Sequence, residues 1–228
     1  MVQNKPHPSK PPATHNDKAA AAPTPEEQPR KRGRPRAYDP ETALAQAMAQ
    51  FWDAGYAATS LDDLSTATGM NRPSLYGAFG DKKALYLKTL ASYRQLGNVT
   101  MAQALSGDDS LAAALARVYG SAIDIYLSGP IAARGCYLIG TAATESVRDA
   151  DIRDAFSAGL HDFDQQITAR IRAAQKRGEI SKKADAAVLG KLAIGVLTSL
   201  ALRARAGEPR QALQEIADAG VRMICAAA

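Results

Sequence analysis

Hydrogen-bonding side chains are concentrated in the segment NRPSLYGAFGDK, residues 71–82. An arginine can donate two hydrogen bonds to the major-groove edge of guanine, and smaller polar side chains can contact bases or phosphates. Arg72 is the candidate for the guanine contact, whereas Thr59, Tyr76 and Lys82 are candidates for phosphate contacts that set the register. The candidate DNA contacts of this region are Thr59, Asn71, Arg72, Ser74, Tyr76 and Lys82.

Two short helices joined by a glycine turn are predicted to position these side chains. Ser60 is a good N-cap for the first helix, and Gly69 provides the permissive backbone at which that helix ends. Pro73 suits the first turn of the second helix, whose Leu75 and Phe79 face inward one turn apart. The pattern is that of a helix-turn-helix, in which the second helix enters the major groove. Two short helices around a glycine also occur in many all-α domains, so the spacing alone leaves both interpretations open.

Residues 59–90, TSLDDLSTATGMNRPSLYGAFGDKKALYLKTL, resemble the N-terminal DNA-binding domain of TetR-type (TetR/AcrR-like) transcriptional regulators. The resemblance covers Ala43 to about Leu90. It implies that Lys82 contacts the DNA backbone. The second helix departs from the family pattern L-Y-x-H-F because Gly77 and Ala78 stand where the family often has an aromatic residue or a histidine. Two possible backbone contacts are therefore missing, and we expect a basic N-terminal arm to compensate for them.

That arm carries the net charge of the whole chain. Residues 1–38 hold eight Lys or Arg against three Asp or Glu, which gives +5, and the other residues balance twenty against twenty. The arm, residues 1–36, is rich in proline and alanine and is predicted to be disordered. Its RGRP sequence is similar to an AT-hook, in which arginines enter a narrow A·T minor groove. General attraction to phosphate is an equal alternative. The candidate arm contacts are Arg32, Arg34 and Arg36.

Composition and periodicity predict an all-α fold: a three-helix helix-turn-helix head and a helical body for effector binding and dimerisation. We expect the head at residues 37–84 and the body at 85–228, with one helix from about Lys82 to about Leu105 joining them. No apolar run is long enough to span a bilayer, and the first residues do not form a secretory signal. Two cysteines are too few for a disulfide framework or a zinc site. We therefore expect a cytoplasmic protein.

No catalytic constellation, metal site or cofactor motif is recognisable, so we do not expect an enzyme. The body instead offers polar tips on apolar helix faces, as small-ligand pockets do. Ordinary core packing is the alternative for each of these residues. The candidate pocket residues are Tyr93, Tyr119, Tyr126, Cys136, Tyr137, Phe156 and His161. Cys136 follows Arg134 where a helix is expected to begin, a setting that lowers a thiol pKa. It also resembles TetR-like regulators that sense electrophiles, although a lone cysteine is more often a small core residue.

The last two predicted helices carry the quaternary expectation. In TetR-like proteins the final two helices pair with their copies in a second subunit, which implies a homodimer reading a palindrome. Burial of both helices within a monomer is the alternative. The sequence thus predicts a repressor that binds double-stranded DNA and is released by an unknown small-molecule or electrophile effector. The rival hypothesis is an architectural protein that coats A·T-rich DNA through its arm without an effector.

Overall fold

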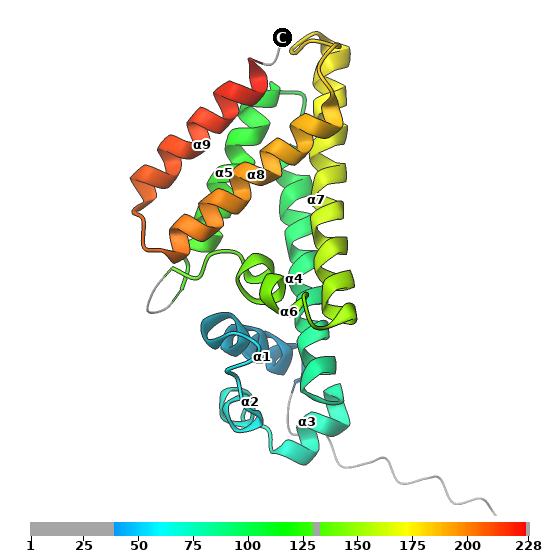
Figure 1. Ribbon diagram of the computed structural model, residues 1–228, viewed down its shortest axis with the longest axis vertical. Coiled ribbons are helices and arrows are strands. Elements are labelled where there is room, and N and C mark those ends of the chain that lie inside the picture. The colour runs from blue at the N-terminus through cyan, green and yellow to red at the C-terminus, as the bar shows by residue number, and fades with distance from the viewer. Residues whose placement is uncertain (1–38, 130–132, 227–228) are drawn as a thin grey trace, which may run out of the picture. The chain divides into compact units, whose positions relative to one another are not determined.

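The computed structural model describes residues 39–129 and 133–226, and every regular element in these residues is a helix (Figure 1). The expected all-α class is confirmed. The arm, with Arg32, Arg34 and Arg36, lies outside the described residues. The chain from residue 37 to 228 forms one compact unit.

The first three helices form the predicted helix-turn-helix head: α1 (Pro40–Ala54), α2 (Leu61–Thr68) and α3 (Arg72–Phe79). The expected Ser60 cap is present, because Ser60 and Asp63 cap each other's amides. The Asp39 carboxylate caps α1 by accepting from the Thr42 amide at 3.0 Å. Gly69 ends α2 in the left-handed conformation, at φ 63°. The buried side chains that hold the head together are Ala43, Ala47, Phe51, Leu64, Leu75 and Phe79.

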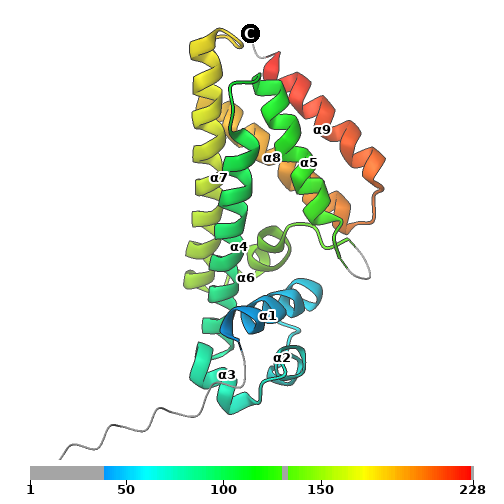
Figure 2. The same ribbon diagram turned by 180° about the vertical axis from the view of Figure 1, so that it is seen from behind.

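Helix α4 (Lys82–Leu105) starts in the head and ends in the body, as the sequence predicts. It crosses the expected domain boundary at residue 84, so the division into 37–84 and 85–228 stays a prediction. Figures 1 and 2 show α4 beside α7 (Ala150–Arg177) along much of its length. Asp162 of α7 accepts from Arg94 Nε at 2.6 Å and from Asn98 Nδ2 at 2.7 Å. These contacts attach α4 to the body.

The body is completed by α5 (Leu111–Tyr126), α8 (Ala186–Arg205) and α9 (Arg210–Cys225). Helix α8 packs against α5, α7 and α9. A Cβ at Gly190 would lie 2.4 Å from Thr168 Oγ1, so the small residue allows α7 and α8 to approach closely. By length and composition α8 could also cross a membrane. Its buried Leu197 and Leu200 belong to the core of the body, whereas Val188, Leu192 and Leu202 are exposed.

The segment between α5 and α7 does not form a regular helix from Cys136, where one is expected to begin. It contains a π-helical turn, η1 (Leu138–Ala142), and a short α6 (Ala143–Glu145). Tyr137 and Thr141 anchor the segment to α4: the Tyr137 hydroxyl lies 2.7 Å from Thr89 Oγ1, and the Tyr86 hydroxyl lies 2.7 Å from Thr141 Oγ1. Regular helix begins only at Tyr137, so Cys136 directly precedes it.

Candidate DNA-reading face and effector cavity

The N-terminal turn of α3 presents the candidate base-reading side chains. Asn71 is the N-cap: its Oδ1 accepts from the Ser74 amide at 2.9 Å, so Asn71 also holds the turn that carries its neighbours. Arg72 and Tyr76 are exposed, with Tyr76 48% accessible, and Ser74 is half-buried. Leu75 and Phe79 are buried on the opposite side of α3. The helix therefore offers its polar edge to solvent, as base readout requires.

Arg72 is held by a carboxylate of the preceding helix. Its Nε and Nη2 donate to the two oxygens of Asp62 at 2.9 and 2.6 Å, and this contact raises the pKa of Arg72 above its ordinary value. Both side chains are more than half exposed. The pair links the guanidinium of α3 to the carboxylate of α2. Arg72 must leave or share Asp62 before it can donate both hydrogen bonds to guanine.

Thr59, an expected phosphate contact, is buried within the head. The residue is only 1% exposed, and its hydroxyl donates to the Gly55 carbonyl at 2.7 Å. Gly55 ends α1, and Thr59 directly precedes the N-cap of α2. Its side chain therefore joins two head helices. A threonine hydroxyl can satisfy a local carbonyl or reach outward, and the sequence does not distinguish the two.

Two lysines of α4 flank the reading helix. Lys82 is half-buried, its Nζ lies 4.6 Å from the centre of the Tyr56 ring, and burial lowers its pKa. Lys88, which the sequence reasoning missed, donates from Nζ to the Phe79 carbonyl at 3.1 Å. A cation is favourable at a helix C-terminus, so Lys88 stabilises the end of α3. The sequence separation of Lys88 from Phe79 does not predict this contact unless the geometry of the turn between α3 and α4 is known.

The body contains a cavity of about 260 Å³. Three of the seven expected pocket residues, Tyr93, Tyr126 and Cys136, line it. Among the described residues its wall carries no Asp, Glu, Lys, Arg or His, and two of its residues, Met48 and Trp52, come from α1. The full lining is Met48, Trp52, Tyr93, Leu96, Gly97, Thr100, Met101, Ala104, Val118, Ser121, Ala122, Ile125, Tyr126, Ser128, Cys136, Phe163 and Leu197.

The other four expected pocket residues lie elsewhere. The Tyr119 hydroxyl donates to the Ala193 carbonyl at 3.3 Å, and Tyr137 meets Thr89, so both phenols are fully buried core residues. Phe156 is half-buried outside the lining, packed against the core. His161 is exposed, and its Nε2 lies 2.7 Å from Gln165 Nε2. Helical spacing places a residue on a face but does not say whether that face meets a cavity or another helix.

Cys136 is a buried thiol. Burial raises its pKa, in contrast to the lowering expected at a helix N-terminus beside a cation. The Tyr93 hydroxyl donates to its Sγ at 3.5 Å. Arg134 is engaged elsewhere: its Nε lies 2.7 Å from the Asp53 carboxylate, and its guanidinium lies 5.5 Å from the centre of the Trp52 ring. The expected cation therefore stabilises α1 instead of the thiolate.

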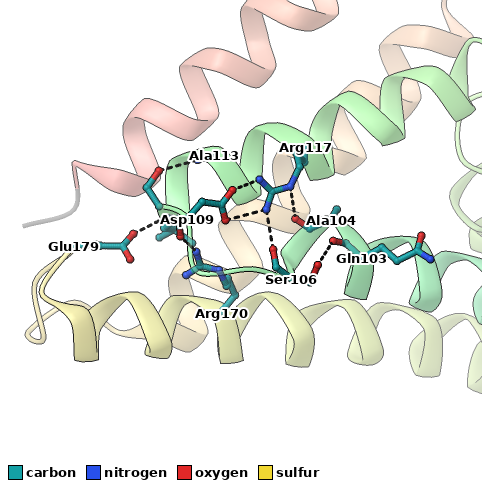
Figure 3. Close-up of polar contacts among 10 residues, drawn as sticks. Gln103, Ala104, Ser106, Asp109, Ala113, Arg117, Arg170 and Glu179 are labelled. Carbon is teal, nitrogen blue, oxygen red and sulfur yellow. Dashed lines mark hydrogen bonds and ion pairs between the residues drawn. The ribbon is translucent and has the colours of Figure 1, made fainter.

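A polar clamp fixes the C-terminal end of α4 (Figure 3). Arg117 of α5 donates to the Ala104 and Ser106 carbonyls at 3.0 Å each and pairs with Asp109. The buried Arg170 of α7 donates to the Asp109 carbonyl. Three helices thus meet at the α4–α5 turn, where unpaired helix-end carbonyls receive charged donors.

An all-α chain with a helix-turn-helix head and a helical body is the architecture of a DNA-binding transcription regulator. Residues 43–89 match the bacterial regulatory proteins of the tetR family, and residues 112–219 match the tetracyclin repressor-like C-terminal domain. The chain belongs to the tetR family of bacterial regulatory proteins.

Individual relatives agree with this assignment. The HTH-type transcriptional repressor ComR of Escherichia coli (strain K12) is 30% identical over 195 residues, which cover 85% of this chain and 92% of ComR. The uncharacterised regulator YezE of Bacillus subtilis (strain 168) is 25% identical over 84% of this chain and 99% of its own length. A cysteine mutant of the regulator CifR, solved with operator DNA, is 31% identical with a TM-score of 0.76, covering 83% of this chain and 98% of that one.

Proposed function

We propose that this protein is a homodimeric repressor that leaves a palindromic operator when a small molecule occupies its cavity. That the chain is a sequence-specific DNA-binding transcription regulator follows from its family. The observation that carries the proposal is the pairing of an exposed reading helix with an uncharged cavity whose wall includes α1 of the same head. The relatives ComR, a repressor, and CifR, solved on its operator, support this proposal.

The proposed DNA contacts follow from the geometry of the head. Arg72 reads guanine after exchanging Asp62 for the base edge, and Asn71 and Ser74 contribute at the start of α3. Tyr76 and Lys82 hold phosphates, because Tyr76 is exposed on α3 and Lys82 lies at the first position of α4. The arm, with Arg32, Arg34 and Arg36, adds phosphate or minor-groove contacts. We assign the protein to the bacterial cytoplasm and give it no catalytic role.

A second copy of the chain is proposed to cover the outer face of α8 and α9. Val188, Leu192 and Leu202 of α8 are each more than half exposed, and Met223 of α9 is 76% exposed. Apolar side chains gathered on two adjacent helices mark an interaction surface. A symmetric dimer would place two heads on a palindrome, which supplies the specificity that one short reading helix lacks.

Release from the operator requires a state that the ligand prefers and DNA does not. A ligand in the cavity shifts the population by its differential affinity for the two states, and by linkage DNA weakens ligand binding by the same factor. Because α1 and α4 both contribute to the wall, occupancy acts on the two helices that support α2 and α3. The spacing of the two heads then no longer matches successive grooves.

Selection of bound fragments from genomic DNA tests the proposal, because a dimer of this kind enriches a palindrome. Arg72→Ala and Arg72→Lys are then compared on the selected site and on random DNA. We expect each variant to lose about tenfold or more per head on the selected site, because lysine cannot reproduce a bidentate contact, with little loss on random DNA. Equal losses on both DNAs would show that Arg72 contacts only phosphate.

The architectural alternative is tested by removing residues 1–36. We expect a weaker but still specific complex, whose salt dependence is shallower by about one unit of slope for each phosphate that the arm neutralises in the intact protein. Loss of nearly all binding, with no sequence preference in the full-length protein, would instead favour an arm-driven A·T-rich DNA-binding protein.

A further inference from the structure

We propose that the effector is a neutral, mainly apolar molecule about the size of two fused rings, and that it binds directly against Trp52 of the DNA-binding head. The regulatory role of the ligand rests on the proposed function, whereas the binding site itself does not. The proposal assigns both the chemical class of the ligand and the first protein element that the ligand touches.

The size follows from the volume of the cavity. A cavity of roughly 150 Å³ lined by apolar side chains binds benzene. The cavity here is about 260 Å³, which leaves room for a bicyclic ring system or a substituted single ring. Thr100, Ser121 and Tyr126 add hydroxyl groups to a wall that is otherwise mostly apolar. A few polar atoms on the ligand can therefore be accommodated.

Because the wall of the cavity is uncharged, we expect an uncharged ligand. In the part of the chain that the structure describes, the lining residues carry no ionisable acid or base other than phenols and one thiol. Burial raises the pKa of Tyr93, Tyr126 and Cys136, so these groups stay neutral at physiological pH. An ionised ligand would lose its hydration without gaining an opposite charge, which costs several kcal/mol for a buried ion. A neutral ligand avoids that cost.

Contact with the head follows from the origin of the wall. Trp52 and Met48 lie on α1, which packs against α2 and α4 in the head. The Trp52 ring also meets Tyr93 of α4, with ring centres 5.2 Å apart in an edge-to-face arrangement. A ligand beside this pair touches α1 and α4 at once. Within the described residues the Trp52 Nε1 also has no hydrogen-bond partner, so movement of the indole breaks no hydrogen bond, although the Arg134 guanidinium lies over the ring.

The chain provides its own reporter for the test, because Trp52 is its single tryptophan. The full-length protein is labelled with ¹⁵N, and its one indole N–H resonance is followed during titration with 2-naphthalenemethanol and with 2-naphthoate. These probes share a ring system and differ in charge at neutral pH. Calorimetry measures their affinities independently. We expect the alcohol to move the indole resonance saturably and to bind at least tenfold more tightly than the carboxylate.

A matched pair of variants on α5 locates the probe. Ala122 lines the cavity, whereas Ala116 is exposed on the same helix. Ala122→Phe should weaken the alcohol at least tenfold by filling the cavity, and Ala116→Phe should leave its affinity unchanged. Circular dichroism checks that both variants fold. If Ala122→Phe does not fold, the titration of the unaltered protein alone decides whether the probe binds beside Trp52.

Three results would overturn the inference: no binding of the alcohol up to its solubility limit, binding that leaves the indole resonance unmoved, or equal affinity for the carboxylate. Operator binding is measured in parallel to separate this inference from the proposed function. An indole shift without operator release supports the site and contradicts effector-driven release. Release without an indole shift supports effector-driven release and contradicts the site.

Discussion

Replacing Thr59 with valine separates a structural role of this residue from a role in holding phosphate. Valine keeps the shape of the buried side chain and removes only the hydroxyl that donates to the Gly55 carbonyl at 2.7 Å. Loss of such a hydrogen bond costs about 0.5–1.5 kcal/mol of unfolding free energy. For a chain of this length each kcal/mol corresponds to roughly 2–4 °C in Tm. We therefore expect Tm to fall by about 1–6 °C.

The assay compares Tm at one protein concentration with the salt dependence of operator binding. Fixed concentration is needed because association of copies contributes to Tm. Thr59→Val should leave the slope of log K against log salt unchanged. Lys82→Gln, at a proposed phosphate contact, is the positive control and should lower the slope by about one unit per head.

The opposite pattern would refute the reasoning. An unchanged Tm together with a smaller salt slope for Thr59→Val would mean that the hydroxyl turns outward to phosphate on the operator. The assignment of Thr59 to the junction between α1 and α2 would then be wrong for the bound state.

Two further predictions concern the body. Leu192→Glu should convert the proposed dimer to a monomer in sedimentation and abolish tight operator binding. The control is Val147→Glu, at an exposed apolar residue outside α8 and α9, which should do neither. A monomeric Val147→Glu variant or a dimeric Leu192→Glu variant contradicts the interface. Cys136, studied in a Cys225→Ser background, should react with iodoacetamide at pH 7.5 much more slowly than in the unfolded chain, because burial raises its thiol pKa. The stabilisation that this thiol contributes is present below the ordinary thiol pKa and is lost as pH rises through the folded value. Equal iodoacetamide rates for the folded protein and the unfolded chain would show an exposed thiolate.

Local chemistry is enough to predict where most helices begin and end. The side chains of Ser60 and Asp81 cap the first turns of α2 and α4, and the left-handed backbone of Gly178 ends α7. These effects are local, so the sequence alone identifies each of these residues. The stripe of apolar residues along α7 is likewise visible at helical spacing. The π-helical turn of η1 is not, because its extra residue per turn is imposed by packing against α4, α7 and α8.

The cavity is predictable only in part, for a related reason. Tyr93, Tyr137 and Tyr119 are equivalent in sequence terms: each is a phenol on an apolar helix face. Only the arrangement of neighbouring helices leaves space beside Tyr93 and fills it beside the other two. Helical spacing places Trp52 in the core of the head, and the structure shows that this core position also borders the cavity. No spacing rule relates α1 to residues of α5 and α8.

If α4 moves as a rigid body, the clamp at its C-terminal end would act as its pivot. Helix α4 has 24 residues, so at about 1.5 Å per residue it is roughly 36 Å long. Gly97, in the cavity wall, lies about 12 Å from the pivot at Leu105, whereas Lys82 lies about 35 Å from it. A sideways displacement of about 0.5 Å at Gly97 would thus become roughly 1.5 Å at Lys82 if α4 moves rigidly. Weakening the clamp at Arg117 would then reduce this amplification without altering the reading helix.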